Sequence, residues 1–365
     1  MISKVKISAL KSIDHLSLDC AKLNVLTGTN SSGKSTFLQA LLLVNQNAEK
    51  WHGLNGRLVS LGDFRLDAKN FNISADEIVI EIETQPASAV PIKMTFKEEN
   101  SQSDESLIGK WAKTIEMNSS KGIFPRKILD TIPSFSTKYL SCNRIGGQDV
   151  YQKNYGQIDD IGINGEYALF YLQMHKSKRL DSALIYDSSS ETLMAQVNYW
   201  LNYIVGTTIS LEDIPGTDIV KASYDIGDDR KIRPRNVGSG TSYLISLLVL
   251  CLSSSKDDIL IIENPEIHLH PRAQSRICEF LYFISQANRQ LFIETHSDHI
   301  FNGIRVGIAT KSMTAEDVAV NFFSLDERHC TQVTKIEFGK NGRVLNYTEG
   351  LFDQFDIDLD RMLQI

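Results

Sequence analysis

One short segment constrains this chain more than any other: residues 28–35 read Gly-Thr-Asn-Ser-Ser-Gly-Lys-Ser. The spacing fits the pattern G-x-x-x-x-G-K-[ST], in which two glycines let the backbone wrap tightly around one anion. Apolar residues predict a strand at Leu23–Leu26 before the segment and a helix at Thr36–Asn45 after it. Strand, glycine-rich turn and helix in this order predict a phosphate-binding loop, because the helix adds the positive end of its dipole.

The loop also predicts the contacts of a bound nucleotide. The ammonium group of Lys34 would reach the β- and γ-phosphates, and the hydroxyl of Ser35 would bind Mg2+. The other expected contacts come from the loop and the first helical turn: Asn30, Ser31, Ser32, Gly33 and Thr36.

Three later segments add chemistry that one loop cannot supply. Residues 258–266 read as a buried strand that ends in acids, which places Glu263 to hold Mg2+ directly or through water. Residues 236–242 are small and polar and precede an apolar helix, so they form a second candidate anion site. Residues 291–297 read as another strand, which ends in Glu294 and His296.

The order of these segments resembles the head of ABC ATPases, and more closely the SMC, RecF and OLD-like branch. Residues 263–271, Glu-Asn-Pro-Glu-Ile-His-Leu-His-Pro, and residues 294–298, Glu-Thr-His-Ser-Asp, resemble motifs of AAA-family ATPases from bacterial anti-phage defence and repair loci. Residues 237–242 resemble the signature segment of the same proteins. The resemblance implies an α/β fold: an ABC-type P-loop NTPase head with a mixed sheet and an inserted α/β lobe.

The resemblance also implies a mechanism and partners. Two heads would enclose two ATP molecules, with Lys34 and Glu263 of one copy facing Gly238, Ser239 and Gly240 of the other. His296 would contact the γ-phosphate. The expected assembly is a homodimer or a higher even oligomer, with a separate nuclease or toxin subunit as the effector, and with DNA as an additional candidate partner.

The residue that follows Glu263 departs from the common ABC pattern. Many ABC proteins have a glutamate here as general base, whereas this chain has Asn264, whose amide cannot accept a proton from water at neutral pH. Either Glu266 or Glu294 replaces it, or hydrolysis is slow and ATP mainly sets the conformation. The function expected first is therefore an ATPase that controls an effector in anti-phage defence. A RecF-like DNA repair ATPase and a non-hydrolysing ATP sensor are the alternatives.

Alternating strand and helix patterns predict how the 365 residues are organised. We expect the head to comprise residues 1–96 and 206–365, and an inserted lobe with a mobile loop to occupy residues 97–205. Shorter predictions are a strand at Arg57–Leu61, a polar excursion at residues 97–126 and a hairpin around residues 339–342, with a strand on each side.

Composition narrows the class of protein. The formal net charge of −7 argues against binding nucleic acid through bulk charge, so any such contact needs a local patch. The five cysteines are widely spaced and never form C-x-x-C, which favours reduced thiols over a disulfide framework or a zinc finger. We find no apolar run long enough to span a membrane and no signal-peptide core at the N-terminus, and we expect a cytoplasmic protein.

Two other clusters have competing interpretations. The histidines of residues 268–299 could bind a metal ion, but the motif set explains them better as loop and switch residues. Lys231, Arg233 and Arg235 precede the signature segment and either contact phosphate or DNA or form a solvated loop. Arg144 is either a phosphate or partner contact or a member of a surface salt bridge.

Overall fold

The structure is a computed structural model of the chain, and it describes residues 1–48, 50–72, 74–85, 91–98, 111–115, 136–227 and 230–363. The chain forms two compact units. Unit 1 contains residues 1–136, 316–337 and 344–365, and unit 2 contains residues 137–315 and 338–343. The predicted lobe at residues 97–205 contributes to both units, because Trp111–Ile115 belongs to the first and Thr137–Leu140 to the second.

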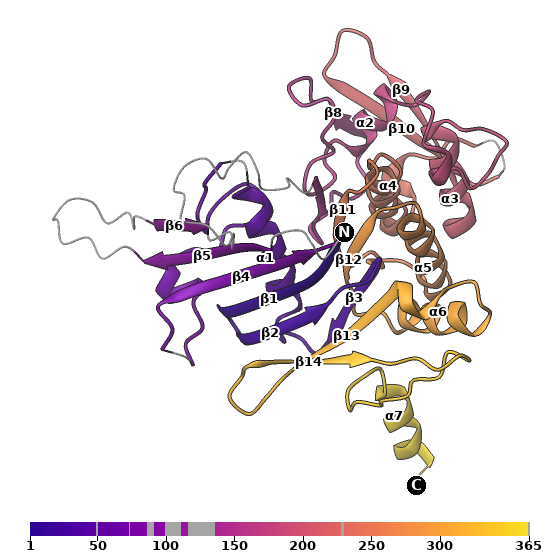
Figure 1. The fold of residues 1–365 in the computed structure, drawn as a ribbon. Coiled ribbons are helices and arrows are strands. Elements are labelled where there is room, and N and C mark those ends of the chain that lie inside the picture. The colour runs from indigo at the N-terminus through magenta and orange to yellow at the C-terminus, as the bar shows by residue number, and fades with distance from the viewer. Residues whose placement is uncertain are drawn as a thin grey trace. The chain divides into compact units, whose positions relative to one another are not determined.

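Unit 1 contains two sets of hydrogen-bonded strands (Figure 1). In the first, the order β2-β1-β4-β5-β6 is antiparallel throughout. In the second, β3 pairs in parallel with β13, which pairs antiparallel with β14. The strands of unit 1 are β1 (Ile2–Leu10), β2 (Ile13–Asp19), β3 (Leu23–Gly28), β4 (Glu77–Thr84), β5 (Ile92–Glu98), β6 (Trp111–Ile115), β13 (Val318–Leu325) and β14 (Thr331–Ile336).

Helix α1 (Lys34–Gln46) follows the phosphate loop and packs on these strands. Nine of its 13 residues are buried, so the loop before it rests on a firmly packed base. A short π-helix, η1 (Phe64–Ala68), and the C-terminal helix α7 (Gln354–Leu363) are the other helices described wholly within this unit.

Unit 2 has a parallel set of strands and a small antiparallel sheet. Strand β11 pairs in parallel with both β7 and β12, and β10 pairs antiparallel with β8 and β9. Because parallel strands end at the same edge, the residues that follow β7, β11 and β12 come together there. The strands are β7 (Thr137–Leu140), β8 (Val150–Gln152), β9 (Thr208–Asp213), β10 (Ile219–Asp225), β11 (Ile259–Glu263) and β12 (Gln290–Glu294).

Helices surround the parallel strands of unit 2. The central one, α4, is buried over nearly its whole length, as expected of a helix that is apolar on all sides. It packs against α2 and α3, whereas α5 and α6 each bury one face and pack against each other. The helices are α2 (Ala168–Met174), η2 (Ser182–Leu184), α3 (Leu193–Val205), η3 (Pro234–Asn236), α4 (Ser239–Leu252), α5 (Pro271–Gln286) and α6 (Asp298–Ala309), and η4 (Ala315–Asp317) lies where the two units join in the chain.

The α/β class and the strand–loop–helix order at the phosphate loop are confirmed, whereas one local prediction is wrong and two hold only in part. Residues Arg57–Leu61 form no strand; this segment has only an isolated bridge between Asn55 and Ser60. The predicted turn at residues 339–342 is present, closed by hydrogen bonds from the Gly339 N–H to the Arg343 carbonyl at 2.8 Å and from the Leu345 N–H to the Glu337 carbonyl at 2.9 Å, but single bridge residues rather than strands flank it, and the hairpin between the full strands β13 and β14 turns at residues 326–330. Within the predicted excursion, residues 111–115 form β6, and residues 99–110 and 116–126 lie outside the described residues.

None of the helices in the described part of the chain is both long enough and apolar enough to cross a membrane.

Candidate functional site

The phosphate loop is closed so tightly that only glycine fits at its two ends. Gly28 has φ 139°, and a Cβ built there would lie 2.0 Å from the carbonyl oxygen of Phe323 in β13. Gly33 has φ 102°, and its Cβ would lie 2.3 Å from Oγ1 of Thr331 in β14. Both glycines therefore serve backbone geometry, as the motif predicts.

Two residues outside the motif hold the loop in this shape. The hydroxyl of Thr331 donates a hydrogen bond to the Ser32 carbonyl at 2.9 Å and lies 2.8 Å from Oγ of Ser12. The N–H of Thr331 donates to the Ser12 carbonyl at 2.7 Å. Sequence reasoning missed both residues, since nothing in their local patterns connects them with the loop.

Lys34 is the first residue of α1 and is nearly fully buried. Its ammonium group donates to the carbonyl oxygens of Gly28 at 3.1 Å and Thr29 at 2.7 Å. The positive charge is therefore held at the loop itself. Among the other predicted contacts, Asn30, Ser31 and Ser35 are exposed, and Ser32, Gly33 and Thr36 are buried.

The carboxylate of Glu263 is fixed at the carboxyl end of β11. Its Oε1 accepts a hydrogen bond from the Tyr139 hydroxyl at 2.9 Å, and its Oε2 accepts one from the Cys142 N–H at 3.0 Å. The hydroxyl pKa of Tyr139 is raised by burial and by the adjacent Glu263 charge, so it remains a donor at neutral pH. Tyr139 and Cys142 thus orient the Glu263 carboxylate at the edge of the parallel strands.

Arg144 does not form the surface salt bridge considered from the sequence. It is buried, and its guanidinium donates to the main-chain carbonyls of Glu263 and Asn264, the latter at 3.1 Å. Burial lowers its pKa to about 10, which still leaves it charged at neutral pH. Arg144 therefore stabilises the turn that carries the acids.

Glu266 and His296 are connected across this edge. Oε1 of Glu266 accepts a hydrogen bond from the His296 N–H at 2.8 Å, while Oε2 is buried and has no hydrogen-bond partner among the described residues. Burial raises the pKa of Glu266, and the bond from His296 opposes that shift. Such a carboxylate has the environment of a proton acceptor.

Glu294 and Asn264 complete the same edge. Glu294 is buried and lies opposite Glu263 in the register of β11 and β12. The Asn264 N–H donates to the Glu294 main-chain carbonyl at 2.8 Å, and Asn264 has φ 43°. Asparagine adopts this left-handed conformation more readily than most residues, which gives Asn264 a structural role besides any chemical one.

Carboxylates gather at this acidic edge. Glu263 and Glu266 lie near the buried guanidinium of Arg144, and Glu294 ends the neighbouring strand β12. Hard carboxylate oxygens are the ligands that Mg2+ prefers. The phosphate-loop residues lie in unit 1, and the acids, His296 and the signature segment lie in unit 2.

The signature segment divides into exposed and buried parts. Gly238 is the N-cap of α4, and it and Ser239 are exposed. Gly240 is buried, and a Cβ built there would lie 2.5 Å from the His268 carbonyl oxygen of the same chain. Gly240 therefore packs α4 against the turn after β11, which leaves Gly238 and Ser239 as the accessible pair.

His268 and His270 contact residues of their own chain near the turn after β11. The ring of His268 stacks on Tyr243 with centroids 5.3 Å apart, and Nδ1 of His270 accepts the N–H of Arg272 at the start of α5. Across the described ranges, no three His, Cys, Asp or Glu side chains are close enough to bind a metal ion together. These contacts favour the interpretation of the histidines as loop residues.

Two protein-family models match most of the chain. Residues 23–302 match the family described as “AAA domain, putative AbiEii toxin, Type IV TA system”. Residues 313–362 match a second family, described as “Protein of unknown function (DUF3696)”. No match was found among curated proteins.

Solved structures similar to the chain include heads of SMC proteins. One is the SMC head bound to the C-winged helix domain of ScpA, with 13% identity, a TM-score of 0.54, and coverage of 93% of this chain and 98% of that one. Another is the SMC head domain from Thermotoga maritima, with 14% identity, a TM-score of 0.50, and coverage of 92% and 99%. A third, an Smc head with an extended coiled coil bound to the C-terminal domain of ScpA derived from Pyrococcus furiosus, has 12% identity, a TM-score of 0.55, and coverage of 100% and 99%. At these identities the likeness establishes the fold, an ABC-type P-loop NTPase head with a mixed sheet.

Proposed function

Because this chain belongs to the AAA-domain family described as AbiEii-type, we propose that it is an ATPase head that dimerises around ATP and controls a partner effector. The observation that carries the proposal is the phosphate loop, with its buried Lys34 held by two loop carbonyls. The cradle fits a phosphate chain because glycines at both ends bring backbone, rather than side chains, to the ligand.

Each site residue has a role in this proposal. Lys34 would bind the β- and γ-phosphates, and Ser35 and Glu263 would hold Mg2+. When bound, Mg2+ neutralises phosphate charge during hydrolysis. Tyr139 and Cys142 keep Glu263 oriented, so Glu263 serves as a fixed ligand in this proposal.

Glu266 is the general base in this proposal. It accepts a proton from water as the water oxygen bonds to the γ-phosphorus and the bond from that phosphorus to the β–γ bridging oxygen breaks, so that ADP leaves. Its unpartnered Oε2 and its raised pKa support this role over Asn264, whose amide cannot take a proton. Glu294, buried at the end of β12, is the other candidate.

The head-to-head arrangement uses the exposed start of α4. Gly238 and Ser239 of one copy would face the γ-phosphate held by the other, with the positive end of the α4 dipole directed at it. His296 is exposed and would sense the same phosphate, and its N–H bond to Glu266 would link sensing to hydrolysis. The proposed head-to-head arrangement predicts homodimers or higher even oligomers.

The effector is expected to be a separate nuclease or toxin subunit in the cytoplasm, acting in anti-phage defence. The family description, which names a putative toxin and a toxin–antitoxin system, supports a partner from such a system. A non-hydrolysing sensor is the second candidate function, and the observation that favours it is Asn264 at the usual position of the base.

Binding is tested first. Lys34→Ala should lose most ATP affinity in calorimetry while keeping a wild-type unfolding curve. Lys335→Ala, which removes an exposed lysine of the same unit, should bind ATP as wild type does. Equal ATP affinity in Lys34→Ala and wild type would exclude the loop as the nucleotide site.

Hydrolysis separates the enzyme from the sensor. In single-turnover assays, Glu266→Gln should bind ATP normally but hydrolyse it about a hundredfold more slowly, the usual scale for loss of a general base. Glu279→Gln, which changes an exposed acid of α5, is the matched control. A comparable loss in Glu294→Gln alone would move the base to Glu294. No phosphate release from wild type, even with DNA and candidate partners present, would leave the sensor function.

A further inference from the structure

The C-terminal helix α7 exposes an apolar face. None of its residues is buried, and Phe355, Leu359 and Met362 fall at positions i, i+4 and i+7, on one side of the helix. Phe355 and Met362 are 75% and 71% exposed. An isolated helix of this length is marginal in water, because helices shorter than about 12–15 residues depend on packing. We therefore expect another protein surface to pack against the apolar face of α7.

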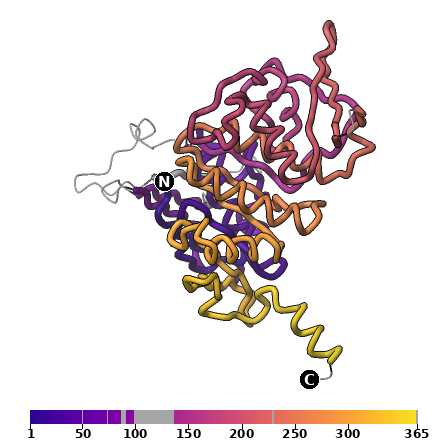
Figure 2. The backbone as a smooth tube through the Cα atoms, turned by 90° about the vertical axis from the view of Figure 1, so that its right-hand side faces the viewer, coloured from indigo at the N-terminus to yellow at the C-terminus, as the bar shows by residue number. Residues whose placement is uncertain are grey.

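The base of α7 is fixed to unit 1 while the helix projects from it (Figure 2). The Asp353 carboxylate accepts hydrogen bonds from the Tyr347 hydroxyl and from the Gly350 N–H, the latter at 2.8 Å. Leu351, just before the helix, is buried. The exposed face is therefore presented by an ordered turn.

Acidic residues border the apolar face on both sides. At about 100° per residue, Asp356 lies beside one edge of the stripe and Asp358 beside the other, while Asp360 lies farther around the helix. A surface that covers this face must be apolar in the middle and carry cations at its rims.

Unit 2 contains a groove lined by both apolar and cationic residues. A cavity of about 430 Å³ lies between the end of α3 and the start of α5. Its apolar lining includes Ile204, Val205 and Ala273, and its cationic lining includes Arg272 and Arg276, one turn apart on α5. The Arg276 guanidinium lies over the ring of Tyr203, 4.6 Å from its centroid, which holds that cation in place.

We propose that α7 of one copy docks into the α3–α5 groove of a second copy, and that the second copy returns the same contact. The charges are complementary, since the helix brings aspartates and the groove brings arginines. One chain carries both halves of the contact, which permits a two-fold exchange. Two such contacts act together, so an interface too small to hold singly can stabilise a dimer. The contact requires no nucleotide and is separate from the proposed ATP-driven closure.

Charge reversal tests the exchange directly. Without nucleotide, sedimentation velocity should show that Asp358→Arg and Arg272→Asp each weaken self-association about tenfold or more, since like charges then face each other at both contacts. Mixing the two variants should restore a mixed dimer, because each of its contacts again pairs opposite charges. Asp360→Arg, on the side of α7 away from the stripe, should associate as wild type does.

A photo-crosslink identifies the copy that receives the helix. Benzoylphenylalanine at position 355 should crosslink to α3 or α5, and in a mixture of 15N-labelled and unlabelled chains the crosslinked peptides should include labelled–unlabelled pairs. Crosslinks only within one chain would overturn exchange with a second copy. A wild type that stays monomeric at high concentration, association unaffected by either charge reversal, or dependence of association on another protein would also overturn it.

Discussion

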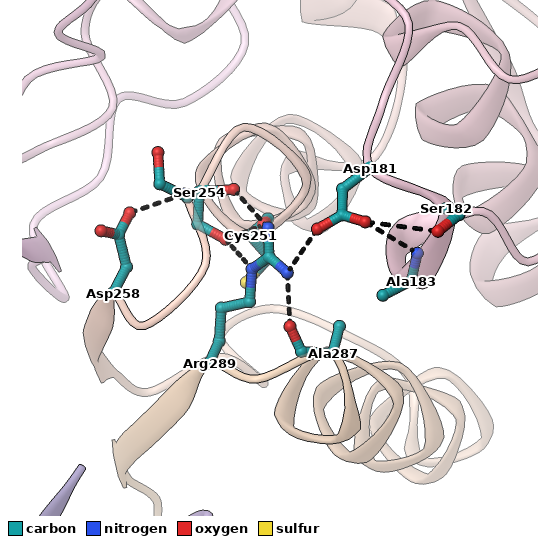
Figure 3. A network of polar contacts seen from close by, with 9 residues as sticks. Asp181, Ser182, Ala183, Cys251, Ser254, Asp258, Ala287 and Arg289 are labelled. Atoms are coloured by element: carbon teal, nitrogen blue, oxygen red, sulfur yellow. Dashed lines mark hydrogen bonds and ion pairs between the residues drawn. The ribbon is translucent and has the colours of Figure 1, made fainter.

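Substitution of Arg289 is the change for which the structure predicts the clearest loss of stability. Arg289 lies directly before β12, is 1% exposed, and is the centre of the network shown in Figure 3. Its guanidinium donates to the Ser254 carbonyl at 2.8 Å, to Oγ of Ser254 at 3.3 Å and to the Ala287 carbonyl. An ion pair at 3.5 Å connects it to Asp181, whose side chain is 43% exposed.

The size of the stability loss depends on which hydrogen-bonding groups are left without a partner after substitution. Arg289→Met keeps much of the apolar stem but leaves the carbonyls of Ser254 and Ala287 without this donor. Each of these two buried acceptors left unpaired costs about 1–3 kcal/mol, so the free energy of unfolding should fall by about 2–6 kcal/mol. Asp181→Asn should cost at most about 1 kcal/mol, because that carboxylate is half in water and Arg289 keeps its carbonyl contacts.

Urea unfolding of the full chain, followed by circular dichroism, measures both losses if the slopes of the transitions are unchanged. Arg343→Met, at an exposed position, controls for the change of charge and should match wild type. ATP affinity of Arg289→Met under native conditions should equal that of wild type, since Arg289 lies at the amino end of β12 and the acids lie at the other end. A loss below about 1 kcal/mol in Arg289→Met, or equal losses in Arg289→Met and Asp181→Asn, would refute this account of the network.

Three further predictions follow from the site and the network. Gly240→Ala should unfold at a lower temperature than wild type, because its Cβ would clash with the His268 carbonyl, whereas Gly238→Ala should unfold at the wild-type temperature, because its Cβ would meet no atom. Equal unfolding temperatures for the two variants would contradict this packing. Tyr139→Phe should raise the Mg2+ concentration needed for half-maximal hydrolysis about tenfold or more, since a hydrogen bond to a charged group contributes about 1.5–3 kcal/mol. ATP affinity without Mg2+ should stay unchanged. An unchanged Mg2+ requirement would contradict the role given to the Tyr139–Glu263 hydrogen bond. The Ala183 N–H and Arg289 lower the pKa of Asp181 below its ordinary value of 3.8, so the stabilising contribution of Asp181 is present above that pH and is lost as pH falls through the folded-state pKa. The stability difference between wild type and Asp181→Asn should therefore vanish at low pH, and a difference that grows on acidification would contradict this sign.

Local patterns were sufficient to predict the phosphate loop. The motif specifies backbone geometry within eight residues, and Gly28 and Gly33 have the positive φ angles that this geometry needs. The contacts that hold the loop were not predictable in the same way. Thr331 lies some 300 residues away in the sequence and reaches Ser32 only because β13 pairs with β3 and β14 with β13.

The acidic edge shows the same division between chemistry and geometry. The sequence predicted Glu263, Glu266, Glu294 and His296 as candidate site residues, because polar residues that follow buried strands gather at one edge. It did not predict that Tyr139 would hold Glu263, since the pairing of β7 with β11 joins segments separated by more than a hundred residues. Pattern reasoning also placed a strand at Arg57–Leu61, where alternating residue types lack a neighbouring strand to pair with beyond one bridge.

The described part of unit 2 contains two buried arginines, Arg144 and Arg289, and we expect one to affect the acidic edge and the other mainly stability. At the carboxyl ends of the strands, Arg144 contacts main-chain carbonyls and leaves the carboxylate of Glu266 with an unpartnered oxygen, an arrangement that costs stability and favours reactivity. At the amino ends, Arg289 is also buried, but its partners are carbonyls, a hydroxyl and one carboxylate, which leaves that network well satisfied. Two buried arginines of similar exposure thus have opposite consequences. Substitution of Arg289 should lower stability and spare activity, whereas substitution of Arg144 should disturb the turn that carries Glu263 and Glu266, and with it hydrolysis.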